Sequence, residues 1–378
     1  GMKIRATGAR YRTRGGLITL AELRRLAEAA VAQGDGRLYA TARQEFVVRG
    51  ISAARVATLL GQPTDRALRN TDSPEANVVS TAPVAGLEGT LDWLSAGTFA
   101  EILERIDCDS PYTVALSDPN QPYLPALMGT INFVATGQRD LWCVRIAPVH
   151  GREELTLHGA VRSSDVPLVA RHAVDFLNRS AALIPDDAAR VFAESLAAFR
   201  VPTQSAVSYP HSYKPPPEAL SIPIDADGLP GGGVIDMCLW AAHHSRVSFG
   251  ITPWKTLLVR GASDAGLTAL RAILLRARMS ETSGSWRSFQ LNTSADERFA
   301  ENVCRELDAR CALQSGLAVG FADEGAPIPD AHVLVRESNL WGPTRWRRAR
   351  RYEVSRRDFD DSRASNWALV SSDCHEAN

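Results

Sequence analysis

Three features are scarce in this sequence of 378 residues: cysteine, an excess of either charge, and long apolar runs. The 6 cysteines lie far apart, and such sparse use in a long chain fits a reducing compartment, where thiols stay free. Lysine and arginine (42) nearly balance aspartate and glutamate (43), so no global field favours nucleic acid or a membrane surface. No apolar run approaches the roughly 18 residues that a membrane span needs. We therefore expect a cytoplasmic protein with no membrane partner.

What is present is typical of a globular chain. Apolar residues make up 45% of the sequence and charged residues 22%. The length predicts two or three domains at roughly 100–200 residues each. Near the start, Thr19 and Glu22 have the spacing of a capping box, and apolar residues then recur at helical intervals up to Gly34. Residues 37–49 predict a strand, and a second helix is expected after Ser52.

The same pattern returns much later in the chain. Residues 252–261 align without gaps on residues 41–50, with Thr, Arg and Gly matching at the same positions. Downstream, Ser263 and Leu267 match Ser52 and Val56, and upstream residues 233–235 match residues 16–18. A repeat that occurs twice indicates two copies of a helix-strand-helix unit, because a solenoid needs three or more.

A longer segment follows each copy. Residues 66–202 contain predicted strands at 112–116, 129–134 and 142–146, and then a helical region from 166 to 199 that we expect to split at Pro185. Residues 203–232 are rich in Pro, Ser and Gly and are the best candidate for a linker. The predicted order is therefore unit, long segment, linker, unit, long segment.

Short motifs in both copies carry a resemblance to a known family. Thr41-Ala42-Arg43-Gln44, followed by Arg69-Asn70 and Ser73-Pro74, is similar to the first half-domain of the nitrite/sulfite reductase superfamily. The second copy, with Thr252-Pro253-Trp254-Lys255, most resembles the precorrin-3B synthase branch. The resemblance implies an α/β (α+β) fold with internal pseudo-twofold symmetry. It implies ferredoxin-like half-domains at 2–65 and 233–280, followed by reductase-like segments at 66–202 and 281–378.

The resemblance also implies an anionic tetrapyrrole, siroheme or a related molecule, held between the two halves. Arginine suits a polycarboxylate ligand because its planar fork meets a carboxylate through paired hydrogen bonds. By position, the ligand-binding candidates are Arg43, Arg49, Arg69, Asn70, Trp254, Lys255 and Arg260. A regular strand would place Arg43 and Arg49 on one face. The alternative for each cation is a solvated edge strand, where charge discourages aggregation.

The sequence departs from the family at the cysteines. Reductases of this type hold a four-iron cluster with thiolates in a Cys-x5-Cys and a Cys-x3-Cys pair, but residues 285–293 and 333–338 contain no cysteine. We therefore expect no 4Fe-4S cluster. The leading hypothesis is a divergent, precorrin-3B synthase-like oxidoreductase that binds a tetrapyrrole or a similar polyanionic metabolite. The alternative is a cofactor-free binding or assembly protein that kept the fold. Neither a metal site nor a catalytic residue emerges from the motifs.

The densest charge run spans residues 345–357, where arginines interleave with Trp346 and Tyr352. Nucleic-acid surfaces often have this composition. A solvated face partly neutralised by neighbouring aspartates, or a lid over an anionic ligand, would have it too. We favour these two interpretations over a nucleic-acid partner.

Overall fold

The computed structural model describes residues 8–281 and five strands beyond them. Within the first range it leaves out 42, 61–67, 72, 74–77, 81–95, 107–109, 111, 118–128, 137, 139, 147–154, 158, 180–184, 203–218, 225–226 and 253–254. The chain forms two compact units. One comprises residues 1–211 and 215–283, and the other comprises residues 212–214 and 284–378.

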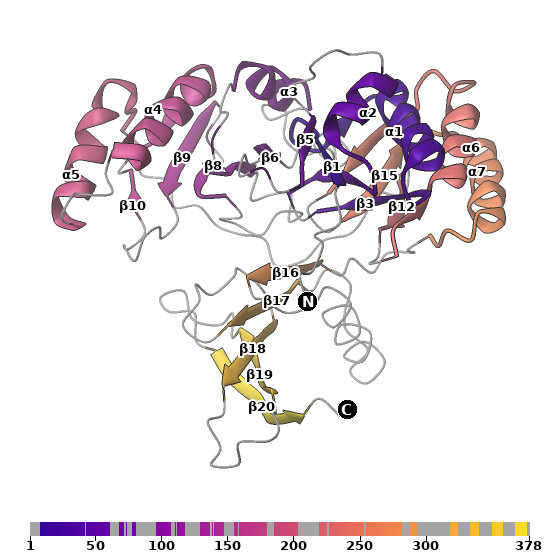
Figure 1. Cartoon of the computed structure of the whole chain (residues 1–378). Helices are drawn as coiled ribbons and strands as arrows, with labels where there is room; N and C mark the ends of the chain where they lie inside the picture. Colours follow the sequence, from indigo (N-terminus) through magenta and orange to yellow (C-terminus); the bar gives the residue numbers. More distant parts are fainter. Residues whose placement is uncertain are drawn as a thin grey trace. The chain divides into compact units, whose positions relative to one another are not determined.

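The first half-domain is a sheet covered by two helices (Figure 1). Its elements are β1 (Gly8–Arg12), β2 (Leu17–Ile18), α1 (Leu20–Gln33), β3 (Arg37–Ala40), β4 (Glu45–Arg49), α2 (Ala53–Leu60) and β5 (Leu68–Asn70). The predicted capping box is present: Glu22 N donates to Thr19 Oγ1, and Thr19 N donates to the Glu22 carboxylate. Helix α1 buries Leu23, Leu26 and the alanines between turns against the sheet, as its spacing predicts.

The second half-domain repeats this arrangement. Its elements are β12 (Ala219–Pro223), β13 (Leu229–Pro230), α6 (Gly231–Ala241), β14 (Ser248–Ile251), β15 (Thr256–Arg260) and α7 (Asp264–Arg276). The first sheet has the order β13-β3-β4-β1-β5 and the second has the order β12-β15-β14-β2. Each sheet thus contains a short strand from the other half, β13 in the first and β2 in the second.

This reciprocal exchange relates the halves by a pseudo-twofold. Ile18 of β2 pairs with Phe249, and Leu229 of β13 pairs with Leu38. These pairs are equivalent when Thr41 is superimposed on Thr252 along the chain. One apolar core runs through both halves, so neither half buries its own surface alone. The predicted internal duplication is confirmed.

Three details of the expected repeat are wrong. Residues 37–49 form a hairpin instead of one strand, because Gln44 takes a left-handed conformation (φ 57°) and the backbone turns at Thr41. Lys255 has the same φ of 57° in the second copy. The unit is therefore a strand, a helix, a hairpin and a second helix.

The upstream match is also wrong, because residues 233–235 lie in the first turn of α6 and the true counterpart of Ile18 is Leu229. Finally, the expected linker at 203–232 contains β12, β13 and the start of α6; its residues 203–218 lie outside the described part. Gly231 and Gly233 allow close packing: a Cβ on Gly231 would lie 2.7 Å from Cγ2 of Val31, and one on Gly233 would lie 2.5 Å from Cβ of Ala277.

The segment between the half-domains forms a second layer within the same unit. Strands β6 (Val78–Ser80), β7 (Val114–Ser117), β8 (Ile131–Ala135), β9 (Leu141–Ile146), β10 (Leu155–Thr156) and β11 (Val161–Arg162) make one sheet. Helices α3 (Ala96–Arg105), α4 (Val166–Arg179) and α5 (Pro185–Ser195) pack on it through a separate apolar core. Turns η1 (Ser163–Asp165) and η3 (Ala197–Phe199) flank the helices. The three predicted strands and the helix break at Pro185 are confirmed.

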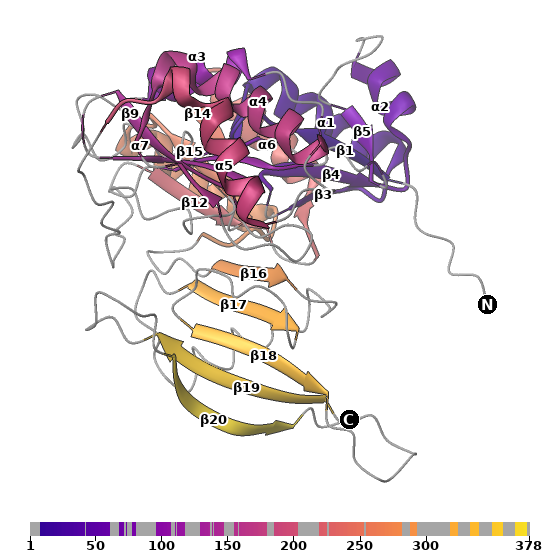
Figure 2. The ribbon, with the colours of Figure 1, turned by 90° about the vertical axis from the view of Figure 1, so that its left-hand side faces the viewer.

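The second compact unit contains one described sheet of five strands (Figure 2). They are β16 (Ser288–Asn292), β17 (Ala318–Asp323), β18 (Val333–Asn339), β19 (Arg350–Arg357) and β20 (Trp367–His375), in that order across the sheet. Part of the predicted basic run is thus strand β19, and residues 345–349 lie outside the described part.

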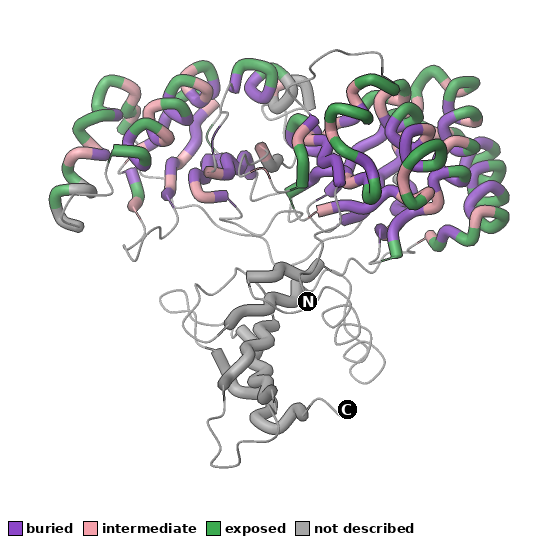
Figure 3. The backbone as a smooth tube through the Cα atoms, in the orientation of Figure 1, coloured by how far each residue is buried: buried purple, intermediate pink, exposed green. Residues whose placement is uncertain are grey.

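The pattern of buried residues matches the arrangement of sheets and helices. In the first unit the strands and inward helix faces are buried and the outer helix faces are exposed (Figure 3). Among the described helices, none has the length and apolarity to cross a membrane. The fold class is α/β, as predicted.

Candidate functional site

Three arginines, Arg10, Arg12 and Arg69, lie on the face of the first sheet that points away from its helices, and Arg43 approaches them from the turn before β4. In β1, Ala9 and Tyr11 belong to the core, so the alternation of a strand places Arg10 and Arg12 on the opposite face. Arg10 pairs directly with Arg69 of β5 on one side and with Val47 of β4 on the other. Two cations are thus side by side on adjacent strands, an arrangement that costs stability unless an anion offsets it.

Glu45 lies within this cluster and is almost completely buried, with 1% of its surface exposed. It pairs with Arg12 across β1 and β4, and its Oε1 lies 3.4 Å from Nε of Arg10. Its Oε2 accepts a hydrogen bond from Thr41 Oγ1 at 2.9 Å. Burial raises the pKa of Glu45, and the nearby charges of Arg10, Arg43 and Arg12 oppose that rise. A buried carboxylate with one strong hydrogen bond thus stands among several guanidinium groups.

Arg43 is exposed in the turn before β4 and reaches the same cluster electrostatically. Burial lowers the pKa of Arg10, Glu45 raises it, and the positive charges of Arg43 and Arg12 lower it again. Arg10 Nη2 also donates to Ser73 O at 3.0 Å, which connects the cluster to the loop after β5. We call Arg10, Arg12, Arg43 and Arg69 the arginine cluster.

The internal duplication shows that the fold does not require these charges. Strand pairing makes Ser221 and Pro223 of β12 the counterparts of Arg10 and Arg12. The counterpart of Glu45 is Thr256, which begins β15 after an equivalent turn. One backbone therefore carries a charged set in the first half and an uncharged set in the second. Since the charges at these three positions occur in only one copy, a ligand is a better explanation for them than folding.

Two other predicted ligand-binding residues, Arg49 and Arg260, do not differ between the halves. They occupy equivalent positions in the two copies, and both are arginine. Arg49 lies over the ring of Tyr39 at 3.5 Å, a cation–π contact at the far end of β4 from Arg43. At roughly 3.3 Å per residue, the four steps of β4 from Glu45 to Arg49 span about 13 Å, and Arg43 lies in the turn beyond the Glu45 end. Because Arg43 is in a turn and not in a strand, they do not share a strand face.

The structure also places three predicted ligand-binding residues, Lys255, Arg260 and Asn70. Lys255 is buried in the second turn, where its carbonyl accepts from Ile224 N at 2.8 Å. Burial lowers the pKa of Arg260. The Asn70 side chain accepts from Ala53 N at 3.0 Å, so it caps the start of α2. Trp254 lies outside the described residues.

The two turns nevertheless meet at the pseudo-twofold. Gln44 is completely buried, and its Nε2 donates to Ile251 O, directly before the second turn, at 2.8 Å. Thr13 Oγ1 in turn donates to Gln44 O and accepts from Gly16 N. These contacts fix the turn that carries Arg43 against the second half. The sequence therefore identified the two equivalent segments, and the structure shows that each contains a turn and what holds the first turn in place.

Sequence reasoning missed Arg10, Arg12 and Glu45. The signal was available, because Arg10, Arg12 and Arg14 alternate with Ala9, Tyr11 and Thr13 as in a strand with one charged face. What the sequence could not show is the register that places β1 between β4 and β5.

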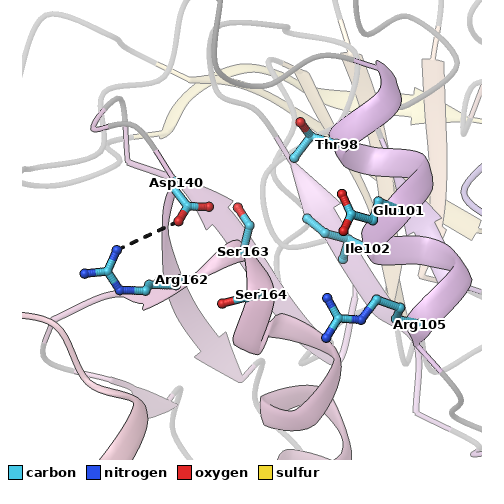
Figure 4. A pocket seen from close by; sticks show the side chains of 8 residues that line it. All are labelled: Thr98, Glu101, Ile102, Arg105, Asp140, Arg162, Ser163 and Ser164. Carbon is cyan, nitrogen blue, oxygen red and sulfur yellow. Dashed lines mark ion pairs between the residues drawn. The ribbon is translucent and has the colours of Figure 1, made fainter.

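A separate groove lies between α3 and η1, with a volume of about 600 Å³. Figure 4 shows Thr98, Glu101 and Arg105 on its helical wall, and Ser163 and Ser164 opposite. Ser163 Oγ accepts from the buried Trp142 Nε1 at 2.8 Å. Asp140 and Arg162 form an exposed ion pair at 3.9 Å. Since acids and bases alternate here, this groove suits a polyanion less well than the arginine cluster does.

No group of three or more His, Cys, Asp or Glu residues suited to a metal ion occurs in the part of the chain that the structure describes. Cys143 and Cys238 are free thiols there, and burial raises the pKa of Cys238 to about 12. Cys108, Cys304 and Cys311 lie outside the described residues.

Comparisons with known proteins address the fold. Residues 7–64 match the family described as nitrite/sulfite reductase ferredoxin-like half domain. The structure of the Mycobacterium tuberculosis NirA protein matches with a TM-score of 0.68 at 16% sequence identity, over 92% of this chain and 74% of that one. No curated protein sequence matches. At this identity the structural likeness establishes the fold alone.

Proposed function

We propose that this chain, which carries a ferredoxin-like half domain of the nitrite/sulfite reductase superfamily and has the fold of that superfamily, binds an anionic tetrapyrrole through the arginine cluster. The observation that carries the proposal is the contrast between the halves: Arg10 and Arg12 stand where the second half has Ser221 and Pro223. A similar polyanionic metabolite would satisfy the same chemistry.

The residues fit a polycarboxylate such as siroheme. Among the described residues, Arg10, Arg12 and Arg43 act on one carboxylate, Glu45, and Arg69 pairs with Arg10 on the next strand, so positive charge is in excess there. The exposed Arg43 and the half-buried Arg12 and Arg69 could each offer paired hydrogen bonds to a carboxylate of the macrocycle, which would fix orientation as well as affinity, and the buried Arg10 would add positive charge behind them. When bound, siroheme would supply a redox-active iron. The role of this chain's arginines would be to bind and orient the macrocycle.

The residues fit a 4Fe-4S cluster poorly. Strands β16 and β18 cover the stretches in which the resemblance places thiolate ligands, and neither contains a cysteine. We therefore propose a precorrin-3B synthase-like oxidoreductase that has no 4Fe-4S cluster. Iron and acid-labile sulfide analysis of the purified protein tests this, since about four of each per chain would contradict it.

The test of the binding site is a titration of the full-length protein with siroheme, followed by absorption spectroscopy. We expect a saturable spectral change whose affinity falls by about 1.5–3 kcal/mol in Arg12→Ala, the scale of a charged hydrogen bond. The matched control is Arg24→Ala, which removes an exposed arginine of α1 that pairs with Glu28. Equal binding by both variants would exclude the arginine cluster. No spectral change with wild type would favour a protein that kept the fold without the cofactor.

A further inference from the structure

We propose that Glu45 is a proton-linked positioning residue of the arginine cluster, and that binding of the polyanion is coupled to uptake of one proton at its carboxylate. The inference rests on the proposed function, because it concerns the same cluster. It assigns a role to Glu45, the acidic side chain that the described part of the chain places in that cluster and that the binding proposal leaves unused.

The contacts of Glu45 form a chain that crosses the cluster. Thr41 Oγ1 donates to Oε2 at 2.9 Å, Oε1 pairs with Arg10 Nε at 3.4 Å, and Arg10 Nη2 donates to Ser73 O at 3.0 Å. Through this chain Glu45 holds the Arg10 guanidinium between the first turn and the loop after β5. It is therefore placed to fix the geometry that a ligand meets.

One oxygen of the Glu45 carboxylate lacks a hydrogen bond within the described part of the chain. Oε1 of Glu45 is buried and accepts no hydrogen bond from any residue that the structure describes. Its contact with Arg10 is an ion pair too long for good hydrogen-bond geometry. A buried carboxylate oxygen without a hydrogen bond is costly in its charged form, and protonation removes that cost.

The second half provides an internal comparison. Its turn has the same hydrogen bonds, Thr252 N to Thr256 O and Lys255 N to Thr252 O, with a neutral residue at the position of Glu45. A carboxylate is therefore unnecessary for the hairpin. Since the carboxylate occurs only in the half that has the arginine cluster, we assign it a role in the function of that cluster.

The coupling follows from competition for the same cations. The charged groups that act on Glu45 are Arg10 and Arg12 from β1 and Arg43 from the turn; Thr41 adds its hydrogen bond. A polyanion bound to these arginines brings negative charge near Glu45 and draws the guanidinium groups away from it. Both effects favour the neutral form, so one proton passes from solvent to the Glu45 carboxylate as the ligand binds.

The sign of the pH dependence follows directly. Burial already raises the pKa of Glu45 in the ligand-free protein, and the bound polyanion raises it further. Affinity therefore increases as pH falls through the interval between the pKa values of the free and bound states. Below that interval Glu45 is neutral in both states and the dependence ends. The variant Glu45→Gln should bind with the affinity of the protonated wild type at every pH.

The experiment is isothermal titration of the full-length protein with siroheme, in two buffers of different ionisation enthalpy, over a range of pH. For wild type we expect tighter binding at lower pH and proton uptake that peaks between the free and bound pKa values of Glu45, at about half a proton per siroheme for the tenfold change in affinity given below. For Glu45→Gln we expect no uptake from this site and about tenfold tighter binding at the upper end of the range, which corresponds to one pKa unit. The control Glu28→Gln removes a carboxylate from the surface of α1 and should behave as wild type.

Siroheme binding without proton uptake, or uptake that persists in Glu45→Gln, would overturn the inference and leave the proposed function intact. Absence of siroheme binding to wild type would overturn both. If Glu45→Gln does not fold, Glu45→Thr, which reproduces Thr256 of the second half, takes its place in the same titration, and uptake that persists in it would overturn the inference.

Discussion

The buried pair of Arg10 and Glu45 allows a sharp test of the contrast between the halves. We consider the transplant of the second half's residues into the first: Arg10→Ser, Glu45→Thr, and both together. These substitutions reproduce Ser221 and Thr256 on an equivalent backbone. The perturbation thus changes the charges while it keeps a combination that the fold already accommodates.

The magnitude follows from burial. Arg10 is 8% exposed and Glu45 1%, so removing Arg10 alone leaves a buried carboxylate without its cation. Breaking a buried ion pair in this way costs about 3–5 kcal/mol. Replacing both partners by neutral residues removes the desolvation cost of each charge, and such replacements are often neutral or stabilising. We therefore expect Arg10→Ser to destabilise β1 and β4 by about 3 kcal/mol and the double variant by less than about 1 kcal/mol.

The dependence on pH has a definite direction. A raised pKa means that folded Glu45 keeps its proton at pH values where the unfolded chain has lost it. Ionisation of Glu45 therefore opposes folding, and its contribution falls as pH rises from the unfolded pKa through the folded pKa. The cost of Arg10→Ser should be full above the folded pKa and should fade in acid.

Hydrogen exchange of the amides in β1 and β4 is the suitable assay, because it reports local opening without assuming that the whole chain unfolds in one step. The single and double variants form a thermodynamic cycle, with an expected coupling of about 3 kcal/mol. Additive effects of the two substitutions would refute the reasoning. So would a cost of Arg10→Ser that does not change with pH.

Three further outcomes follow from the structure. Arg43→Ala should weaken siroheme binding by about 1.5–3 kcal/mol in the same titration, whereas Arg49→Ala should weaken it less, because Arg49 packs on Tyr39 at the other end of β4; equal losses would contradict this division. Gly233→Ala should lower thermal stability by about 1–3 kcal/mol, because its Cβ would lie 2.5 Å from that of Ala277, and an unchanged melting temperature would show that α6 shifts freely. Cys238, with its pKa raised to about 12, should resist alkylation near neutral pH until denaturant is added, as peptide mass spectrometry would detect.

The sequence determined the local elements and the duplication. Thr19 and Glu22 predicted the start of α1 correctly, because a capping box is a contact between residues three positions apart. The match of residues 41–50 with 252–261 identified the duplication, and the glycine that ends each matched segment, Gly50 or Gly261, has the positive φ that favours glycine. Such features need only neighbouring residues, and they also carried the family resemblance.

Side-chain periodicity was less reliable than these local signals, in helices as well as in strands. Val31 on α1 and Leu59 on α2 follow the helical apolar pattern, yet they are 52% and 40% exposed. The sequence between Arg37 and Arg49 alternates as one strand would, but a left-handed residue at Gln44 divides it into a hairpin. A single backbone rotation at Gln44 moves Arg43 away from the strand face that it would otherwise share with Arg49.

Only the tertiary structure decided which charges meet. Arg10 and Arg69 are 59 positions apart in the chain, and the register of β1 with β5 makes them direct neighbours. Glu45 enters the same cluster through the register of β1 with β4. The sequence contains the residues of each strand but not the order of strands in the sheet, which depends on how both halves exchange strands and bury one common core. Strand order and register are long-range properties, and for that reason the arginine cluster and its carboxylate became visible only in the folded chain.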